Sequence, residues 1–342
     1  MYNCTGSSSK LVVILGGGAG FVYSSIRAFY GKEIDMDLLT LKTWSSDDIL
    51  QAVEMGLVIK KNPERYEGLL KGQTLAMLFQ KTSTRTRVSF EVGIHQLGGQ
   101  AVFLDWMTTN FGLADVRDEA QVLSRYADVI MARLLKHEDL LRLTLGSEVP
   151  VINGCCDRYH PCQALGDLLS ILEVRGKLAG THVVYVGIWN NVCNSLVTAC
   201  TKAGVRITAV TPEINKPSAD PELVKAARAT GLFEETLDLE AAVADADFVY
   251  TDTWIDMEFF NNPEFAEEKK RRTEVFMPYQ INSELLKKTD AYVMHCLPAH
   301  KGYEVTDEVM ASERCIAVDQ AENRMHIQKA VLIQMIGPER IT

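Results

Sequence analysis

The sequence predicts an α/β protein of two domains, each a mostly parallel sheet with helices on both faces. The chain has 342 residues, about twice the length of a typical domain of roughly 150 residues. Hydrophobic residues make up 47% and charged residues 23%, which excludes wholesale disorder, collagen and coiled coil. Short apolar runs typical of buried strands alternate with segments of helical periodicity, and this alternation favours parallel sheets.

The first domain is expected over residues 39–176. A helix begins within Thr43–Asp48, where hydroxyl side chains cap the first turn and acids complement the helix dipole. The apolar run Leu75–Phe79 is a buried strand, and Arg87–Leu97 is a helix that ends at two glycines. The remaining strands of this half are Ala101–Leu104, Val129–Ala132 and Val149–Asn153.

The second domain is expected over residues 177–318, after a boundary at Gly176–Gly180 where a helix rich in Leu and Ile ends. Val183–Gly187 is a continuous apolar strand, and Val192–Ala203 is a helix. The further strands are Arg206–Val210, Phe248–Tyr250, Ala291–Met294 and Cys315–Val318. Ligands of parallel sheets bind at the carboxyl ends of the strands, so functional residues are expected there.

Composition excludes several classes of partner. Lys and Arg number 35 against 45 Asp and Glu, a formal net charge of -10, and no basic run offers a surface for nucleic acid. The eight cysteines are too sparse for a disulfide scaffold and form no Cys-x-x-Cys pair, which favours a reducing, cytoplasmic location. A ligand that carries phosphate would therefore need a locally focused positive site.

Residues 1–38 form a leader of unknown role. Its stretch Leu11–Ile26 is mostly apolar, but glycines interrupt it and it is shorter than the roughly 20 residues that span a bilayer, so no membrane partner is expected. The glycines suggest a dinucleotide loop as an alternative. That interpretation lacks an acidic residue about 20 positions later inside a βαβ unit.

An anion site is predicted where the strand Leu75–Phe79 leads into a helix through Ser83, Thr84, Arg85 and Thr86. Hydroxyl groups, backbone amides and guanidinium groups meet at a helix N-terminus, which favours a phosphate. The alternative is a polar cap with solvent-facing arginines. Basic residues in the first turn oppose the helix dipole, which argues against that alternative.

Two further clusters follow predicted strands. His160 and Gln163 are three positions apart at the start of a helix, so both can direct N–H donors at a carbonyl oxygen, although an ordinary capping histidine is the alternative. Cys296, at the end of the strand Ala291–Met294, is a nucleophile, a metal ligand or a buried small side chain. Zinc is disfavoured because His295 and Cys296 have no spaced Cys or His partners.

Taken in order, three motifs resemble the aspartate/ornithine carbamoyltransferase family: Ser83–Arg87, His160–Gln163 and His295–Pro298. The last motif is similar to that of the ornithine branch, and putrescine carbamoyltransferases are also similar. The resemblance covers about Leu39–Gly337. Supporting stretches are Val122–Tyr126, Ala132–Arg133, Pro278–Asn282, Glu304–Glu308 and Ala321–Arg324.

The resemblance implies a fold, a reaction and an assembly. The first domain would bind carbamoyl phosphate, the second would bind a primary-amine acceptor, and a C-terminal helix within residues 319–342 would pack back on the first domain. An uncharged amine would attack the carbamoyl carbon. With ornithine as the acceptor, the products would be citrulline and phosphate. The family uses no cofactor, no metal and no covalent intermediate, and it forms homotrimers or multiples of trimers with sites at subunit boundaries.

The resemblance also implies roles for individual residues. Those expected at carbamoyl phosphate are Ser83, Thr84, Arg85, Thr86, Arg133, His160, Gln163, Cys296, Leu297 and Arg324. Catalytic roles are implied for Arg85, Arg133, His160, Cys296 and Arg324. Acceptor-binding roles are implied for Asn191, Asp252, Asp256 and Met257.

The sequence departs from the family pattern at the acceptor loop. Asp256 and Glu258 stand where the ornithine enzymes carry Ser and Gly. Added negative charge favours a cationic acceptor, so putrescine or another diamine remains an alternative to ornithine. Asn110 replaces a residue that in many relatives reaches a neighbouring subunit, and Ile188 replaces a common Asp.

Two other classes of function remain as alternatives. A catalytically silent relative would act as a binding subunit, and the altered loops favour it while intact Arg85 and His160 oppose it. A dinucleotide-dependent dehydrogenase would need glycines after Val183–Gly187, where Ile188 and Trp189 are bulky.

Overall fold

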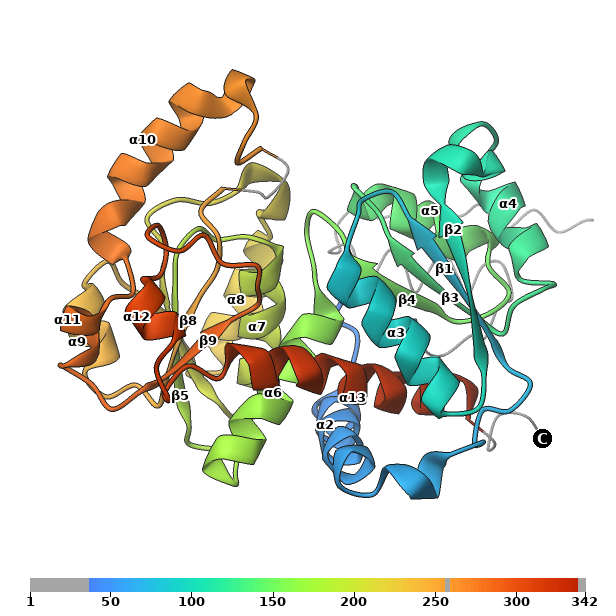
Figure 1. The fold of residues 1–342 in the computed structure, drawn as a ribbon, viewed down its shortest axis with the longest axis horizontal. Helices are drawn as coiled ribbons and strands as arrows, with labels where there is room; N and C mark the ends of the chain where they lie inside the picture. Colours follow the sequence, from blue (N-terminus) through green and yellow to red (C-terminus); the bar gives the residue numbers. More distant parts are fainter. Residues whose placement is uncertain (1–36, 256–258, 338–342) are drawn as a thin grey trace, which may run out of the picture. The chain divides into compact units, whose positions relative to one another are not determined.

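The computed structural model describes residues 37–255 and 259–337, and it confirms the predicted α/β fold with two parallel sheets (Figure 1). In the first sheet the strand order is β2-β1-β3-β4, and every pairing is parallel. Its strands are β1 (Thr74–Phe79), β2 (Gln100–Asp105), β3 (Val129–Arg133) and β4 (Val151–Cys155). The leader, apart from its last two residues, lies outside the described residues.

The second sheet is also parallel throughout, with the order β7-β6-β5-β8-β9. Its strands are β5 (His182–Val186), β6 (Arg206–Val210), β7 (Phe233–Glu235), β8 (Phe248–Thr251) and β9 (Tyr292–His295). The central strand β5 is buried along its whole length, as expected for a strand covered on both faces.

Within residues 37–255 and 259–337, five long helices pack around the two sheets. They are α2 (Ser46–Lys61), α3 (Thr84–Gln96), α6 (Pro161–Arg175), α7 (Asn191–Lys202) and α13 (Ala317–Ile336). The shorter helices are α4 (Val116–Leu123), α5 (His137–Gly146), α8 (Pro221–Ala229), α9 (Leu239–Val243), α10 (Ala266–Phe276), α11 (Ser283–Leu286) and α12 (Asp307–Met310). The 3-10 turns are Pro63–Tyr66, Trp106–Thr108, Asn110–Gly112, Lys216–Ser218, Pro263–Phe265 and Met277–Tyr279. No helix of the described residues is long and apolar enough to cross a membrane.

Helix α13 packs against α2, α3 and α6, as Figure 1 shows. One hydrophobic core joins these helices to both sheets: it includes Met77 of β1, Tyr185 of β5, Leu168 of α6 and Val331 of α13. The last helix of the chain therefore completes a core that residues near the start of the described chain begin.

Local sequence explains where several elements begin and end. Ser45 caps α2: its Oγ accepts from the backbone N of Asp48 at 3.1 Å, and the Asp48 carboxylate accepts from the backbone N of Ser45 at 2.9 Å. Helix α6 ends at Gly176, whose φ of 68° is a left-handed conformation that favours glycine.

Two predicted elements differ in the structure. The helix predicted over Arg87–Leu97 begins earlier, at Thr84, because the Oγ of Ser83 accepts from the backbone N of Thr86 and caps it. The strand predicted over Cys315–Val318 is wrong: Cys315 forms a single bridge to Val293, and α13 begins two residues later. A short apolar run fits a buried helical turn as well as a strand, so periodicity could not separate them.

Candidate active site

The first motif forms the first turn of α3. The Oγ of Ser83 lies 3.0 Å from Thr86 Oγ1 and accepts from the Thr86 backbone N at 3.3 Å. Thr86 is buried, Thr84 is exposed, and Arg85 is half-buried. A guanidinium N–H of Arg85 donates to the carbonyl oxygen of Leu297, so the first motif contacts the third across 212 positions of sequence.

Arg324 of α13 connects the first motif to the second. Its side chain is buried, and its Nη1 donates to Gln163 Oε1 at 3.1 Å while its Nη2 donates to Thr86 Oγ1 at 2.9 Å. The structure thus brings together three sequence motifs and one helix that are widely separated in the chain. We refer to Arg85, Arg133, His160 and Arg324, together with Ser83, Thr84 and Thr86 at the start of α3, as the cationic cradle.

Positive charges crowd the cradle. Burial, followed by the charges of Arg85 and Arg133, lowers the pKa of Arg324 to about 10. Burial also lowers the pKa of Arg85, and the guanidinium of Arg133 lowers it further. The Nε atoms of all three arginines are buried and make no hydrogen bond to the described residues. Buried donors without acceptors are costly, so the cradle is suited to an anion that supplies both charge and acceptors.

His160 is held at the edge of the cradle as a neutral imidazole. Its backbone N donates to Ser195 Oγ at 2.8 Å, and its Nδ1 is buried without a hydrogen-bond partner in the described part of the chain. Burial and then the three arginines hold the pKa of His160 well below its usual range. A neutral imidazole can donate from one ring nitrogen and accept at the other.

Asp252 and Cys296 form a pair at the ends of β8 and β9. The buried carboxylate of Asp252 accepts from Cys296 Sγ at 2.9 Å, from Asn190 Nδ2 at 2.7 Å and from the Thr253 backbone N at 2.7 Å. Burial, with the adjacent charge of Asp252, raises the pKa of the Cys296 thiol well above its usual range. A thiol held protonated is a weak nucleophile and a poor metal ligand.

The structure describes some, but not all, of the other residues predicted on the acceptor side. Asn191 begins α7, and its Nδ2 donates to the Cys156 carbonyl at 2.6 Å. Asp256 and Met257 lie outside the described residues. Asn110 is exposed on a 3-10 turn, so its reach toward a neighbouring subunit stays a prediction.

A cavity of about 320 Å³ opens beside the cradle. Arg133 and Asn191 line it from one side, and Phe259, Lys269 and Arg272 line it from the other. Two cations of α10 thus stand at the rim of a space large enough for a small amino acid. Among the described residues, no group of three or more His, Cys, Asp or Glu side chains could hold a metal ion.

A network of buried polar groups behind the site was missed by sequence reasoning. Asp167 Oδ1 accepts from Gln163 Nε2 at 2.9 Å and from Gln320 Nε2 at 2.7 Å, and Gln320 Oε1 accepts from the His295 backbone N at 2.9 Å. Burial raises the pKa of Asp167 to about 7. The available signal was a carboxylate one turn after Gln163 in a helix that is otherwise mostly apolar.

Fold and site together define the class of protein. It is a two-domain α/β enzyme in which a cationic cradle on the first sheet faces a buried carboxylate on the second. The chain belongs to the aspartate/ornithine carbamoyltransferase family. Residues 36–173 match the model of its carbamoyl-P binding domain, and residues 179–335 match that of its Asp/Orn binding domain. The resemblance inferred from the three motifs is confirmed.

Individual relatives agree with this membership. The ornithine carbamoyltransferase of Thermococcus kodakarensis is 46% identical over 314 residues, 88% of this chain and 96% of that protein. That of Archaeoglobus fulgidus is 42% identical over 310 residues, 88% of this chain and 98% of that protein. The structure of the Pyrococcus furiosus ornithine carbamoyltransferase matches with a TM-score of 0.82 and 44% identity, covering 88% of this chain and 97% of that one.

Proposed function

We propose that this protein transfers the carbamoyl group of carbamoyl phosphate to the side-chain amine of ornithine, releasing citrulline and phosphate. The observation that carries the proposal is the convergence of Arg85, Arg324 and His160 on one site, opposite the pair of Asp252 and Cys296. The names of the relatives, ornithine carbamoyltransferases at 41–46% identity, support ornithine as the acceptor.

The cationic cradle would bind the donor. The phosphate would accept from the first turn of α3, with Ser83, Thr84 and Thr86, and from Arg85 and Arg324. Gln163 already donates to Asp167 and accepts from Arg324. Its Oε1 keeps a second lone pair that can accept from the carbamoyl N–H, so we assign Gln163 to positioning the donor.

Chemistry would proceed by direct attack. The neutral side-chain amine forms a bond to the carbamoyl carbon, a tetrahedral oxyanion develops, and the bond to the phosphate oxygen then breaks. Arg85, Arg133 and neutral His160 are the donors available for the oxyanion, and Arg85 and Arg324 stabilise the leaving phosphate. The proton that the amine releases leaves with phosphate or through water.

Asp252 and Cys296 would orient the incoming amine. Asp252 is already fixed by three hydrogen-bond donors, so its carboxylate is a rigid acceptor for an amine N–H. Leu297 supplies the carbonyl that holds Arg85 in place. Asn191 and, beyond the described residues, Asp256 and Met257 would contact the rest of the acceptor.

Ornithine carries a carboxylate that putrescine lacks. Two features of the acceptor side favour different choices between these two acceptors. The acids of the 252–258 loop favour putrescine, a diamine without a carboxylate. Lys269 and Arg272 in the cavity lining favour an acceptor with a carboxylate. Both already have partners, because Arg272 pairs with Glu268 at 2.8 Å and Lys269 Nζ donates to the Phe260 carbonyl at 3.1 Å. We assign ornithine because the similar proteins of Thermococcus kodakarensis and Archaeoglobus fulgidus are ornithine carbamoyltransferases.

We further propose the assembly, location and division of the chain that the family resemblance implies. The protein would be a cytoplasmic homotrimer or a multiple of trimers, and the free state of every described cysteine supports a reducing compartment. The donor would bind to residues 39–176 and the acceptor to residues 177–318, with the C-terminal helix returning to the first domain.

The test is product formation from carbamoyl phosphate with ornithine, putrescine, lysine and N-acetylornithine in separate reactions. We expect turnover with ornithine to exceed that with each of the others by at least tenfold in kcat/KM. Arg85→Ala should abolish turnover. The matched control is Arg87→Ala on the exposed face of the same helix, where Arg87 pairs with Glu91 at 3.4 Å, and it should leave turnover intact. Inactivity with all four acceptors would reject the proposal.

A further inference from the structure

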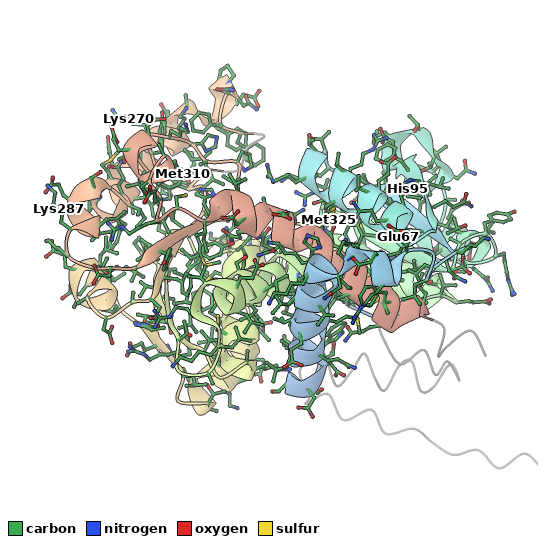
Figure 2. The ribbon with its side chains drawn as sticks, turned by 60° about the horizontal axis from the view of Figure 1, so that its bottom comes forward. Glu67, His95, Lys270, Lys287, Met310 and Met325 are labelled. Carbon is green, nitrogen blue, oxygen red and sulfur yellow. The ribbon has the colours of Figure 1, made fainter. Side chains whose placement is uncertain are left out.

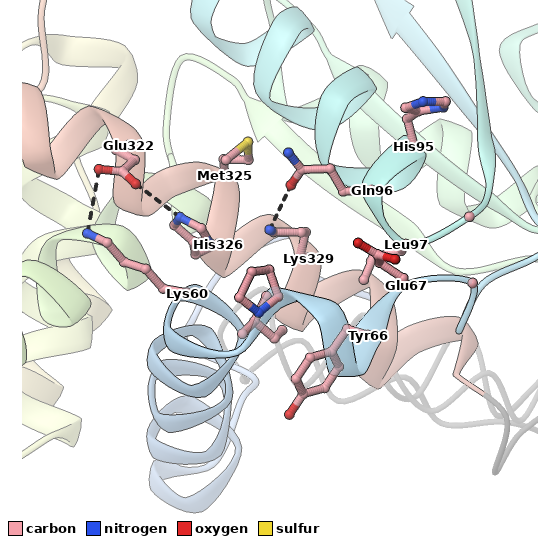
Figure 3. Close-up of a pocket in the computed structure, with 14 residues that line it drawn as sticks. Lys60, Tyr66, Glu67, His95, Gln96, Leu97, Glu322, Met325, His326 and Lys329 are labelled. Atoms are coloured by element: carbon pink, nitrogen blue, oxygen red, sulfur yellow. Dashed lines mark hydrogen bonds and ion pairs between the residues drawn. The ribbon is translucent and has the colours of Figure 1, made fainter.

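A second cavity shares no lining residue with the cationic cradle, and Figure 3 shows the side chains that line it. Its volume is about 600 Å³, within the range of small-molecule sites. The end of α2, the end of α3 and one face of α13 form its walls. Figure 2 shows three of its lining residues: Glu67 after the 3-10 turn Pro63–Tyr66, His95 of α3 and Met325 of α13.

Lys329 is the most unusual residue of this cavity. Its side chain is 2% exposed, and its Nζ donates to the neutral Oε1 of Gln96 at 2.8 Å. No carboxylate within residues 37–255 and 259–337 lies within ion-pair distance of that Nζ. Lysines are almost never buried unless an anion pairs with them, so this amino group lacks a counter-ion.

His326 provides a second buried polar group on the same wall. It is 6% exposed, and its Nε2 lies 3.3 Å from Glu322 Oε1. Its Nδ1 is buried with no hydrogen-bond partner among the described residues. Burial lowers the pKa of His326 and of Lys329, as expected for cationic groups whose charge is not fully compensated.

The remaining lining residues set the character of a ligand. Lys60 adds a third amino group, but Glu173 at 3.0 Å and Glu322 at 3.6 Å already pair with it. Glu322 is half-exposed, so water screens its charge better than that of the buried Lys329. Tyr66 and Met325 contribute apolar wall.

We propose that this cavity binds a small organic anion, whose carboxylate or phosphate group lies against Lys329 and His326 and whose apolar part lies against Tyr66 and Met325. The anion supplies the missing counter-ion of Lys329 and an acceptor for a protonated Nδ1 of His326. The site is separate from the cationic cradle and shares no residue with it.

The cavity and the cradle share two helices. Arg324 of the cradle and His326 of the cavity lie two residues apart on α13, and α3 carries Thr86 at one end and Gln96 at the other, about 15 Å away. The helices are in close contact near the C-terminal end of α3, where a Cβ at Gly93 would lie 3.3 Å from Lys329 Cγ. An anion that shifts Lys329 would therefore displace α3, so binding here is linked to donor affinity. The linkage between this cavity and donor affinity rests on the proposed function, whereas anion binding in the cavity does not.

The test is calorimetric titration of the full chain with citrate, inorganic phosphate and benzoate in turn. The cradle is first saturated with a bisubstrate phosphonate, so that phosphate cannot bind there. We expect at least one anion to bind with one site per chain. Citrate and benzoate test the carboxylate arm, and phosphate tests the phosphate arm. Lys329→Gln and His326→Gln should each weaken binding by at least tenfold, and the exposed Lys61→Gln on α2 is the matched control with unchanged affinity.

Thermal unfolding checks that the variants fold. Because Lys329→Gln removes an unpaired buried charge, this variant should be at least as stable as the parent. Absence of binding by all three anions, or equal binding by both variants and the parent, would overturn the proposal. If the phosphonate itself does not bind, the proposed function fails. The same titrations on Arg85→Ala then still decide whether the second cavity holds an anion.

Discussion

Replacing Arg324 with methionine separates the stability of the cationic cradle from its binding function. A pKa of about 10 in place of 12.5 means that keeping Arg324 charged costs about 3 kcal/mol in the folded state. Its two hydrogen bonds, to Gln163 and Thr86, contribute about 1.5–3 kcal/mol each. Since these effects oppose each other, Arg324→Met should change the free energy of unfolding by no more than about 3 kcal/mol.

Affinity should respond much more strongly than stability. A guanidinium that bonds a phosphate contributes about 3 kcal/mol, so we expect Arg324→Met to weaken binding of the bisubstrate phosphonate by about 100-fold. Urea unfolding measures the first quantity and calorimetric titration measures the second. Both are measured at the same pH and salt concentration, since ionic strength screens the charges.

Arg314 offers a matched control. It also makes two hydrogen bonds, to the carbonyl oxygens of Thr289 at 2.7 Å and Leu286 at 2.9 Å, but it is not part of the cradle. Arg314→Met should lower the free energy of unfolding by about 3–6 kcal/mol, at about 1.5–3 kcal/mol for each bond, and leave phosphonate affinity unchanged. Unchanged affinity in Arg324→Met, or a loss of stability above about 5 kcal/mol, would refute the reasoning.

Three other predictions follow from the described contacts. Asp252→Asn should raise the KM for ornithine by at least tenfold in steady-state assays while the KM for carbamoyl phosphate stays within threefold; equal effects on both would contradict its assignment to the acceptor. Cys296→Ser should keep at least a tenth of kcat, since a thiol with a raised pKa is no nucleophile, and complete inactivity would contradict this. Burial lowers the pKa of His137 to about 4, so the unfolded chain takes up a proton near pH 6.5 before the folded one does. His137 should therefore lower the free energy of unfolding by up to about 3 kcal/mol between pH 6.5 and 4, and in urea titrations the change over this range should differ by that amount between His137→Gln and the parent.

Much of the fold could be predicted because the buried strands are continuous apolar runs. The central strand β5 was predicted within one residue at each end, and β6 was predicted over the same residues. The short edge strand β7 was missed, since only Phe233 of its three residues is buried. An edge strand with one buried side chain shows no alternation of apolar and polar residues by which a strand could be predicted.

The candidate site could be predicted only where local sequence carries the chemistry. The first turn of α3 combines hydroxyl groups and arginines at a helix N-terminus, so Ser83–Arg87 indicated an anion without any knowledge of the fold. Arg324 carries no such local pattern, because its partners are 161 and 238 positions away. The role of Arg324 in the site was predicted from the family resemblance alone. Asp167 was missed because the amide groups that surround it come from α6 and α13.

The position of α13 has a consequence for the protein's biosynthesis. The core that encloses Met77 and Leu168 also needs Ile327, Val331 and Met335, which are synthesised much later than the residues they pack against. Until α13 has been synthesised, the apolar faces of α2, α3 and α6 that it covers in the folded protein have no helix to pack against. Native packing of the first sheet and its helices therefore cannot be completed before α13 has been synthesised, and a circular permutant in which α13 precedes α2 should complete it at an earlier stage of synthesis.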